Sequence, residues 1–517
     1  MIMIDGNTLT LEQVEAAAAG SPAALDAEAR QRMLQSRAWV EEIVAGASPV
    51  YGINTGFGIF ADRSIPPEAT AKLNRNLIVS HAVGAGPALP AEVVRAAMLI
   101  RANTLALGHS GARPEVVETL LEMLNRRVTP VIPSQGSLGS SGDLAPLSHL
   151  ALVFTRDEAD LEEESGWADL GEAQPERLSG KEAMRRAGIE RLVLGPKEGL
   201  AISNGATFSA ALGALAVRRA MHLLEVAEVS LAMSLEAMLG ASAAYDARLH
   251  KARRHPGQIA VAQRVRALTG GSSLLDAAGR VQDAYSLRCG PQVQGAARDT
   301  LAYAARVVEN EINAATDNPL LFGPCQALSG GNFHGEPVGM ALDFLAIAMA
   351  EVAAISERRI FRLTDAKLNA GLPPMLVDSP QAAGLNSGMM MPQYTAASLV
   401  LENATLAHPD SVHSLPTSAE QEDHNANSMT AARHAWQVLE NTAHVLAIEV
   451  YCAGRALDLR LRQMPEARPG RGVAAAHARL RAEVPYRPGD AWWGPEIEQA
   501  RRLILQPEFL QAAAESA

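Results

Sequence analysis

The segment from residue 136 to residue 143 carries residue types in an order that permits chemistry on the backbone itself. It reads Gly-Ser-Leu-Gly-Ser-Ser-Gly-Asp. Because glycine has no Cβ, the amide nitrogen of Gly142 can approach the carbonyl of Ser140 closely in a tight bend. Attack of that nitrogen on the carbonyl closes a five-membered ring. Loss of water from the ring and from the Ser141 side chain then leaves an exocyclic methylidene, which is a strong electrophile.

Composition alone favours a plainer interpretation of this segment. Runs of Gly and Ser are common in flexible linkers and in turns that bind phosphate. The segment is one of five polar loops, however, and the others cover 51–58, 203–207, 329–337 and 416–428. Most of them mix Gly with Asn, His, Tyr or Glu. Loops on a rigid scaffold are where binding and catalytic groups gather, so this set favours an active site over helix caps and turns.

Long helices are expected to carry these loops. Apolar residues recur at helical spacing over 91–107, 114–126, 209–240, 338–363 and 429–462. Residues 338–363 are apolar nearly all round, which indicates a helix buried among other helices. We therefore predict an all-α fold with a long-helix bundle core and a smaller N-terminal domain whose polar, Gly-rich loops carry the active site.

The predicted division of the chain is at residue 200. Residues 1–200 form the N-terminal domain that carries the 136–146 loop, and residues 201–517 form the bundle and the C-terminal region. Two segments depart from the helical pattern. Residues 156–186 are acidic and polar, as expected of a surface excursion, and residues 464–496 are rich in Pro, Gly and Arg.

Several classes of protein are disfavoured by the bulk properties of the sequence. The formal net charge of −12 argues against nucleic acid and against an anionic membrane as partners. The three cysteines are isolated, so neither a disulfide framework nor a metal site is predicted. The sequence contains no GxGxxG, GxxxxGK[ST], HExxH or GxSxG motif. With no signal-like N-terminus, and with acidic residues interrupting the most apolar stretch, we expect a cytosolic location.

A resemblance to a known family favours the active-site interpretation of the 136–143 segment over a linker or a turn. The segment 136–150, GSLGSSGDLAPLSHL, closely resembles the signature of the aromatic amino acid ammonia-lyase family, whose usual triplet is Ala-Ser-Gly. Further segments match the family in order along most of the chain: 51–58, 76–86, 197–206, 282–292, 310–320, 329–337, 371–377, 384–397 and 406–424. The members that act on histidine are the most similar.

The resemblance implies an activity and a prosthetic group. Family members remove ammonia and a β-proton from an amino acid, and they use a methylidene-imidazolone (MIO) group that they form themselves. Here that group would come from Ser140, Ser141 and Gly142, with no external cofactor. The implied reaction converts L-histidine to trans-urocanate and ammonia, in a homotetramer with shared active sites.

The family also implies roles for individual residues. Tyr51 matches the base that takes the β-proton, and Asn204 and Tyr285 match residues that line the MIO and the substrate amino group. Arg288 matches the arginine that binds the substrate carboxylate, a task that suits a guanidinium fork. Gln282 lies six residues before Arg288. If this stretch is helical, Gln282, Tyr285 and Arg288 lie near one face of the helix.

Two further matches are Phe333, an aromatic wall of the pocket, and Asp143. The Asp143 carboxylate would orient the ring closure. Its equally simple alternative is an N-cap of the helix that follows.

Substrate choice is assigned to two places. Ser80-His81 matches the pair found in histidine lyases, and Glu422, in QEDH, matches a carboxylate that accepts a hydrogen bond from the substrate imidazole. After QEDH the chain is two residues longer than the usual HVSM ending. On the alternative alignment, His424 takes the selective position, as in phenylalanine lyases. Three alternatives stay open: a tyrosine or phenylalanine lyase, an aminomutase on the same group, or a helical scaffold without catalysis.

Overall fold

The computed structural model describes residues 1–46, 49–172 and 174–516. Its α-helices are α1 (Leu11–Ala18), α2 (Ala27–Ala45), α3 (Thr70–His81), α4 (Ala91–Ala106), α5 (Pro114–Asn125), α6 (Leu144–Phe154), α7 (Gly180–Ala187), α8 (Glu198–Ser203), α9 (Thr207–Ala237), α10 (Ala247–Arg253), α11 (Pro256–Leu268), α12 (Tyr285–Arg288), α13 (Gly290–Glu311), α14 (Glu336–Thr364), α15 (Met390–Leu406), α16 (Ser428–Gln463), α17 (Arg471–Glu483), α18 (Trp493–Ile504) and α19 (Pro507–Ser516).

The strands are short and pair in small ribbons. They are β1 (Ile2–Ile4), β2 (Ala23–Leu25), β3 (Ala85–Ala88), β4 (Val128–Pro130), β5 (Pro133–Gln135), β6 (Thr155–Arg156), β7 (Trp167–Leu170), β8 (Glu176–Ser179), β9 (Leu192–Val193), β10 (Leu320–Leu321) and β11 (Ala327–Leu328). The ribbons pair as β1-β2, β3-β5, β4-β7-β8, β6-β9 and β10-β11. The all-α prediction is confirmed, and the five predicted long helices correspond to α4, α5, α9, α14 and α16.

Local sequence accounts for several helix boundaries. Thr10 and Gln13 form a capping box at the start of α1, because each side chain satisfies a backbone N–H at that end. Pro114 opens α5, where its missing N–H costs no hydrogen bond. The predicted surface excursion at 156–186 contains the antiparallel β7–β8 pair and α7.

The described chain forms two compact units. Unit 1 comprises residues 1–218, 304–343 and 409–433, and unit 2 comprises residues 219–303, 344–408 and 434–517. Unit 1 therefore contains residues 1–200, the N-terminal domain predicted from the sequence, together with residues 201–218, 304–343 and 409–433, which the prediction gave to the bundle and C-terminal region.

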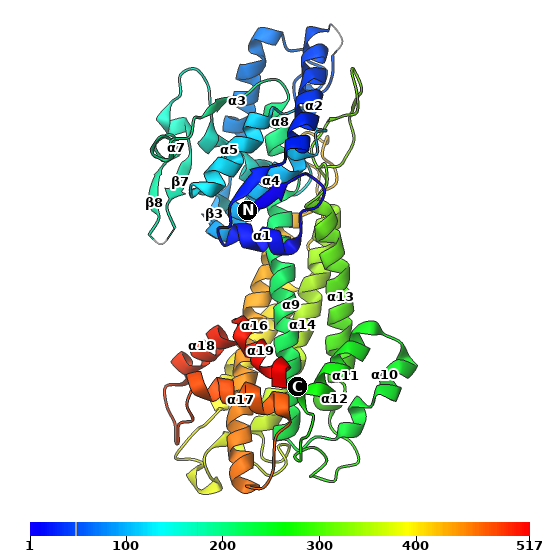
Figure 1. Ribbon diagram of the computed structural model, residues 1–517, viewed down its shortest axis with the longest axis vertical. Coiled ribbons are helices and arrows are strands. Elements are labelled where there is room, and N and C mark those ends of the chain that lie inside the picture. Colours follow the sequence, from blue (N-terminus) through cyan, green and yellow to red (C-terminus); the bar gives the residue numbers. More distant parts are fainter. Residues whose placement is uncertain (47–48, 173, 517) are drawn as a thin grey trace. The chain divides into compact units, whose positions relative to one another are not determined.

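Unit 2 is built around the long helices α9, α13, α14 and α16 (Figure 1). Glu449 on α16 is fully buried and joins three of them. Its carboxylate accepts hydrogen bonds from Ser230 and Ser234 on α9, and from Ser356 and the guanidinium of Arg359 on α14. A buried charge needs such partners, because an unpaired one is costly outside water.

Helix α14 is the one helix of the described residues that is long and apolar enough to cross a membrane, with a mean hydropathy of 1.9. Of its most apolar window, 67% is buried inside the protein. The core helix of a folded domain has the same properties.

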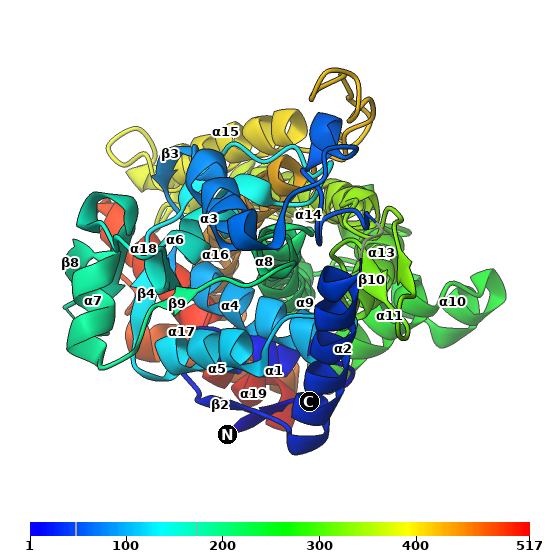
Figure 2. The same cartoon turned by 90° about the horizontal axis from the view of Figure 1, so that it is seen from above.

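Unit 1 gathers the segments that carry the candidate chemistry. Helices α3, α6 and α8 pack against one another (Figure 2). Strand β3, which follows α3, pairs with β5, which leads into the 136–143 loop. The end of α3, the start of α6 and the end of α8 are thereby brought to one place.

Candidate active site

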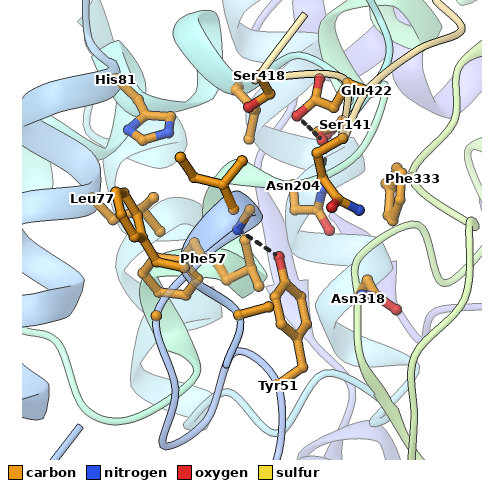
Figure 3. A pocket seen from close by; sticks show the side chains of 18 of the residues that line it. Tyr51, Phe57, Leu77, His81, Ser141, Asn204, Asn318, Phe333, Ser418 and Glu422 are labelled. Carbon is orange, nitrogen blue, oxygen red and sulfur yellow. Dashed lines mark hydrogen bonds between the residues drawn. The ribbon is translucent and has the colours of Figure 1, made fainter. Parts of the chain in front are cut away.

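A cavity of about 1390 Å³ lies in unit 1 where these segments meet (Figure 3). We call it the unit 1 cavity. Of the residues singled out from the sequence, its lining includes Tyr51, His81, Ser140, Ser141, Asn204, Phe333, Glu422 and His424. These residues come from segments far apart in the chain, so the fold brings together most of the predicted site.

The Ser140–Gly142 triplet is tightly bent beside this cavity, whose lining includes Ser140 and Ser141. Gly142 has a φ of +74°, and a Cβ on it would lie 2.0 Å from the carbonyl carbon of Gly205. Only glycine fits there, for reasons of both backbone conformation and space. The Ser141 carbonyl accepts hydrogen bonds from the Gly205 N–H at 3.1 Å and from the Asn204 side-chain amide at 2.7 Å. The loop is thus rigid where the proposed ring closure requires a fixed bend.

Asp143 lies buried behind the triplet. Its carboxylate accepts hydrogen bonds from the Ser137 hydroxyl at 2.7 Å, the Ser209 hydroxyl at 3.0 Å and the Ser209 N–H at 2.8 Å. Burial raises the pKa of the Asp143 carboxyl, and these donors act in the opposite direction. Asp143 stands at the N-cap position of α6 but makes no side-chain capping bond to it. The capping alternative is therefore wrong for α6, and the carboxylate instead accepts the Ser209 N–H in the first turn of α9.

Glu422 reaches the reactive serine directly. The Ser141 hydroxyl donates a hydrogen bond to the Glu422 carboxylate at 3.0 Å (Figure 3). Glu422 closes a short hairpin with Thr417, because each residue's N–H bonds to the other's carbonyl. The residues in the bend, Ser418 to Glu420, all have φ between 52° and 69°. This left-handed conformation is uncommon for residues other than glycine, and it turns Glu422 toward the triplet.

His424, the alternative selective residue, is engaged elsewhere along the cavity wall. Its ring stacks on that of His334 with centroids 5.9 Å apart and an interplanar angle of 11°. Its carbonyl accepts a hydrogen bond from the His334 ring at 3.1 Å. Of the two candidates, Glu422 is the residue whose side chain contacts the triplet.

His81 ends α3 and faces the cavity (Figure 3). Its Nδ1 lies 2.9 Å from the Ser80 hydroxyl. Burial lowers the pKa of His81, while the negative charge of Glu422 acts in the opposite direction. A neutral imidazole can either donate or accept a hydrogen bond in such a site.

Tyr51 and Phe333 also border the cavity. The Tyr51 hydroxyl accepts a hydrogen bond from the Gly58 N–H at 3.4 Å, within the 51–58 loop. Sequence reasoning did not single out Asn318, Phe57 or Leu77, which also line it. Asn318 bonds the Ser329 hydroxyl and the Gly330 N–H and so steadies the 329–337 loop. Its place in the 310–320 motif was the signal available in the sequence.

Three predicted residues lie in unit 2 and are not part of the unit 1 cavity lining. Tyr285 and Arg288 belong to the short helix α12, and Gln282 precedes that helix. The predicted shared helical face therefore holds for two of the three residues. The Arg288 guanidinium lies 4.7 Å over the Tyr285 ring, and Tyr285 is 70% exposed. The Nε of Arg288 is buried and has no hydrogen-bond partner within the described residues.

Comparison with known proteins agrees with this geometry. The family model for aromatic amino acid lyases matches residues 9–482. Over 516 residues the chain is 48% identical to histidine ammonia-lyase of Gloeobacter violaceus, which covers 99% of this chain and 97% of that protein. Over 510 residues it is 50% identical to histidine ammonia-lyase of Anaeromyxobacter dehalogenans, with 97% and 98% covered.

Solved structures give the same fold. Histidine ammonia-lyase from Trypanosoma cruzi superposes with a TM-score of 0.90 at 38% identity, covering 100% of this chain and 95% of the other. Tyrosine aminomutase from Streptomyces globisporus superposes with a TM-score of 0.91 at 35% identity, covering 100% and 99%.

Proposed function

This chain belongs to the aromatic amino acid lyase family, and on that premise we propose that it eliminates ammonia from L-histidine to give trans-urocanate. As a member of the family it is a carbon–nitrogen lyase. The observation that carries the substrate assignment is the contact between Glu422 and Ser141. It places the Glu422 carboxylate beside the triplet, and loss of the Ser141 hydroxyl in the ring closure would leave that carboxylate free to accept a hydrogen bond from an imidazole N–H.

The residues of the triplet fit the prosthetic group of the family. Gly142 is held in a bend that excludes any side chain, and the Ser141 carbonyl is fixed by two donors. Ser140, Ser141 and Gly142 would form the MIO group, in which the Gly142 nitrogen bonds to the Ser140 carbonyl carbon with loss of two waters. Once formed, the group supplies an electrophile for the substrate amine.

The surrounding residues bind the substrate and move its protons. Tyr51, across the cavity from Ser141 in Figure 3, would take the β-proton. Asn204 has a buried side-chain oxygen without a hydrogen-bond partner in the described residues, which suits it to accept a hydrogen bond from the substrate amine. Phe333 would pack against the substrate, and His81 with Glu422 would bind its imidazole ring.

We further propose that the active form is a homotetramer in the cytosol. The family resemblance implies active sites shared between chains, and we propose that a second chain supplies Gln282, Tyr285 and Arg288, which lie in unit 2. The Tyr285 side chain, which is 70% exposed, is accessible to that second chain.

The test is incubation with L-histidine, L-tyrosine and L-phenylalanine separately, with the unsaturated acid followed by its ultraviolet absorbance. We expect product from histidine at a rate well above the other two. Because the fold is also similar to that of tyrosine aminomutase, formation of a β-amino acid should be measured as well. A β-amino acid formed from tyrosine, with no urocanate from histidine, would replace the proposed function by an aminomutase.

A further inference from the structure

The hydroxyl of Ser140 takes no part in the proposed ring closure, which uses only the carbonyl of that residue. In the structure the hydroxyl is nevertheless engaged. The side-chain amide of Asn425 donates a hydrogen bond to Ser140 Oγ at 2.6 Å. Both residues are buried, Ser140 at 4% exposure and Asn425 at 1%. Removing Ser140 Oγ leaves the Asn425 amide as an unpaired buried donor, and removing that amide leaves Ser140 Oγ as an unpaired buried acceptor.

Asn425 also holds together the two arms of the segment that carries Glu422. Its side-chain oxygen accepts a hydrogen bond from the Leu415 N–H at 3.0 Å, and its own N–H donates to the Ser414 hydroxyl at 2.9 Å. The arms that leave the Thr417–Glu422 hairpin are therefore joined at Asn425. Its remaining side-chain contact, to Ser140, ties that junction to the triplet.

A second, backbone contact shows which part of the loop the segment approaches. The Asn427 N–H donates to the Leu138 carbonyl at 2.7 Å. The segment 414–427 is thus joined to the triplet loop on the C-terminal side of the hairpin. Glu422 lies only three residues before Asn425, and it contacts Ser141 from the same side.

We infer that the Ser140–Asn425 hydrogen bond is a positioning contact, which sets the Glu422 carboxylate at its place over the triplet and thereby supports binding of the substrate ring. This inference rests on the proposed function. Neither Ser140 Oγ nor Asn425 needs to touch the reacting atoms. They act through Glu422, so that their loss is expected in substrate binding rather than in formation of the electrophile.

The experiment compares Ser140→Ala, Asn425→Ala and the double variant. Each single change should raise KM for the substrate about 5- to 30-fold, with kcat within about threefold, because loss of uniform binding raises KM alone. The double variant should be no worse than the poorer single variant, since both remove the same contact. Intact mass should still fall short of the sequence mass by two waters in all three.

Thr442→Val is the matched control. Thr442 Oγ1 accepts a hydrogen bond from the Asn403 side-chain amide, and both residues are fully buried in unit 2. This change removes the same type of contact away from the unit 1 cavity. It should lower the melting temperature without changing KM, which separates positioning from general stability.

Three outcomes would overturn the inference. They are KM values of both single variants within twofold of the parent, effects that multiply in the double variant, and loss of the mass deficit with KM unchanged. If Asn425→Ala does not fold, Ser140→Ala decides alone, because it removes a single oxygen atom. If the parent protein itself lacks the mass deficit and makes no unsaturated acid, the proposed function fails instead, and that result is distinct from all three.

Discussion

The unit 1 cavity and the α12 surface of unit 2 hold the predicted site residues in opposite states. In the cavity the polar groups already bind one another: Ser141 with Glu422, and Asn204 with the Ser141 carbonyl. On α12, Tyr285 is 70% exposed and the Arg288 Nε is without a partner within the described residues. The polar groups of the cavity are thus held in place by their own chain, whereas most of the Tyr285 side chain is open to solvent.

The surroundings of α12 support the proposal that a second chain covers this surface. A hollow of about 630 Å³, which we call the α13–α14 groove, is lined mainly by apolar residues that include Phe344 and Ile347. Tyr285 lines a neighbouring hollow that shares Val293 with it. Apolar surface of this kind favours association with another chain. In the proposed tetramer, covering this surface and completing the site are a single event.

Breaking the cavity at its electrophile should have the largest effect. Ser141→Ala removes the side chain that loses water, so activity should be abolished with every substrate. Intact mass should show the parent short of its sequence mass by two waters, and the variant should regain one or both. An active preparation with the full sequence mass would refute the assignment of the triplet.

A charge placed in the α13–α14 groove should have the second largest effect. Phe344 is 40% exposed, and Phe344→Asp places a charge where an apolar contact is proposed. We expect dissociation in analytical ultracentrifugation and loss of most activity, with helical circular dichroism retained.

The matched control for this change is Leu161→Asp, at a residue that is 43% exposed in unit 1. It should leave both the assembly and the activity unchanged. A fully active monomer, whether parent or variant, would contradict the proposal that the two regions meet across chains.

A substitution of Arg288 tests whether its guanidinium binds the substrate carboxylate. Arg288→Lys keeps the charge but loses the planar fork that pairs with a carboxylate. The loss in kcat/KM should correspond to about 2–4 kcal/mol, because the proposed contact with the substrate carboxylate would be bidentate and desolvated. Steady-state kinetics measure it, and Arg253→Lys, in the exposed part of α10, is the control. Unchanged kinetics in Arg288→Lys would remove that residue from the site.

Changing the cavity wall should alter selectivity more than rate. An apolar substrate ring leaves buried polar groups unpaired, at about 1–3 kcal/mol for each group. His81 and Glu422 together should therefore exclude phenylalanine by roughly two to four orders of magnitude. His81→Leu should weaken this exclusion, measured as the ratio of kcat/KM for histidine and phenylalanine, with the mass deficit intact.

A pair of variants sharpens that test. Glu422→Gln should reduce activity on histidine far more than His424→Gln, because only Glu422 contacts the triplet. The reverse ranking would mean that the alternative alignment governs the pocket, and it would direct the substrate assignment toward phenylalanine-type enzymes.

The smallest effect concerns stability alone. Glu236, fully buried in unit 2, accepts hydrogen bonds from the Gly470 N–H, and burial raises its pKa to about 7. Because the folded protein holds this proton more tightly than the unfolded chain, stability is highest at low pH and falls as pH rises through about 4.5 to 7. Glu236→Gln should remove this loss and stabilise the protein by at most about 3 kcal/mol above pH 7.

Melting temperatures at pH 5 and pH 8 measure this difference. Glu163→Gln, at an exposed residue in unit 1, is the control. An equal change of melting temperature with pH in the parent and in Glu236→Gln would show that Glu236 does not cause it.

Helix positions and the reactive triplet were predictable from local patterns. Helix α16 spans Ser428–Gln463, close to the predicted 429–462. The prediction succeeded because the spacing of apolar residues along a helix is a local property of its sequence. The bend at Gly142 was expected for a similar reason, since glycine permits a conformation that other residues avoid. The role of Asp143 was not predictable in full. Its carboxylate caps α9, and that helix lies more than sixty residues further along the chain.

The sequence by itself determined the all-α class, the long helices and the chemistry available in Ser140, Ser141 and Gly142, because these depend on neighbouring residues. Only the tertiary structure decided that Glu422 rather than His424 contacts Ser141, and that Asn425 binds Ser140. Such contacts depend on how distant segments pack. The bend at residues 418–420, which turns Glu422 inward, has left-handed backbone angles but contains no glycine, so the sequence gives no local sign of it.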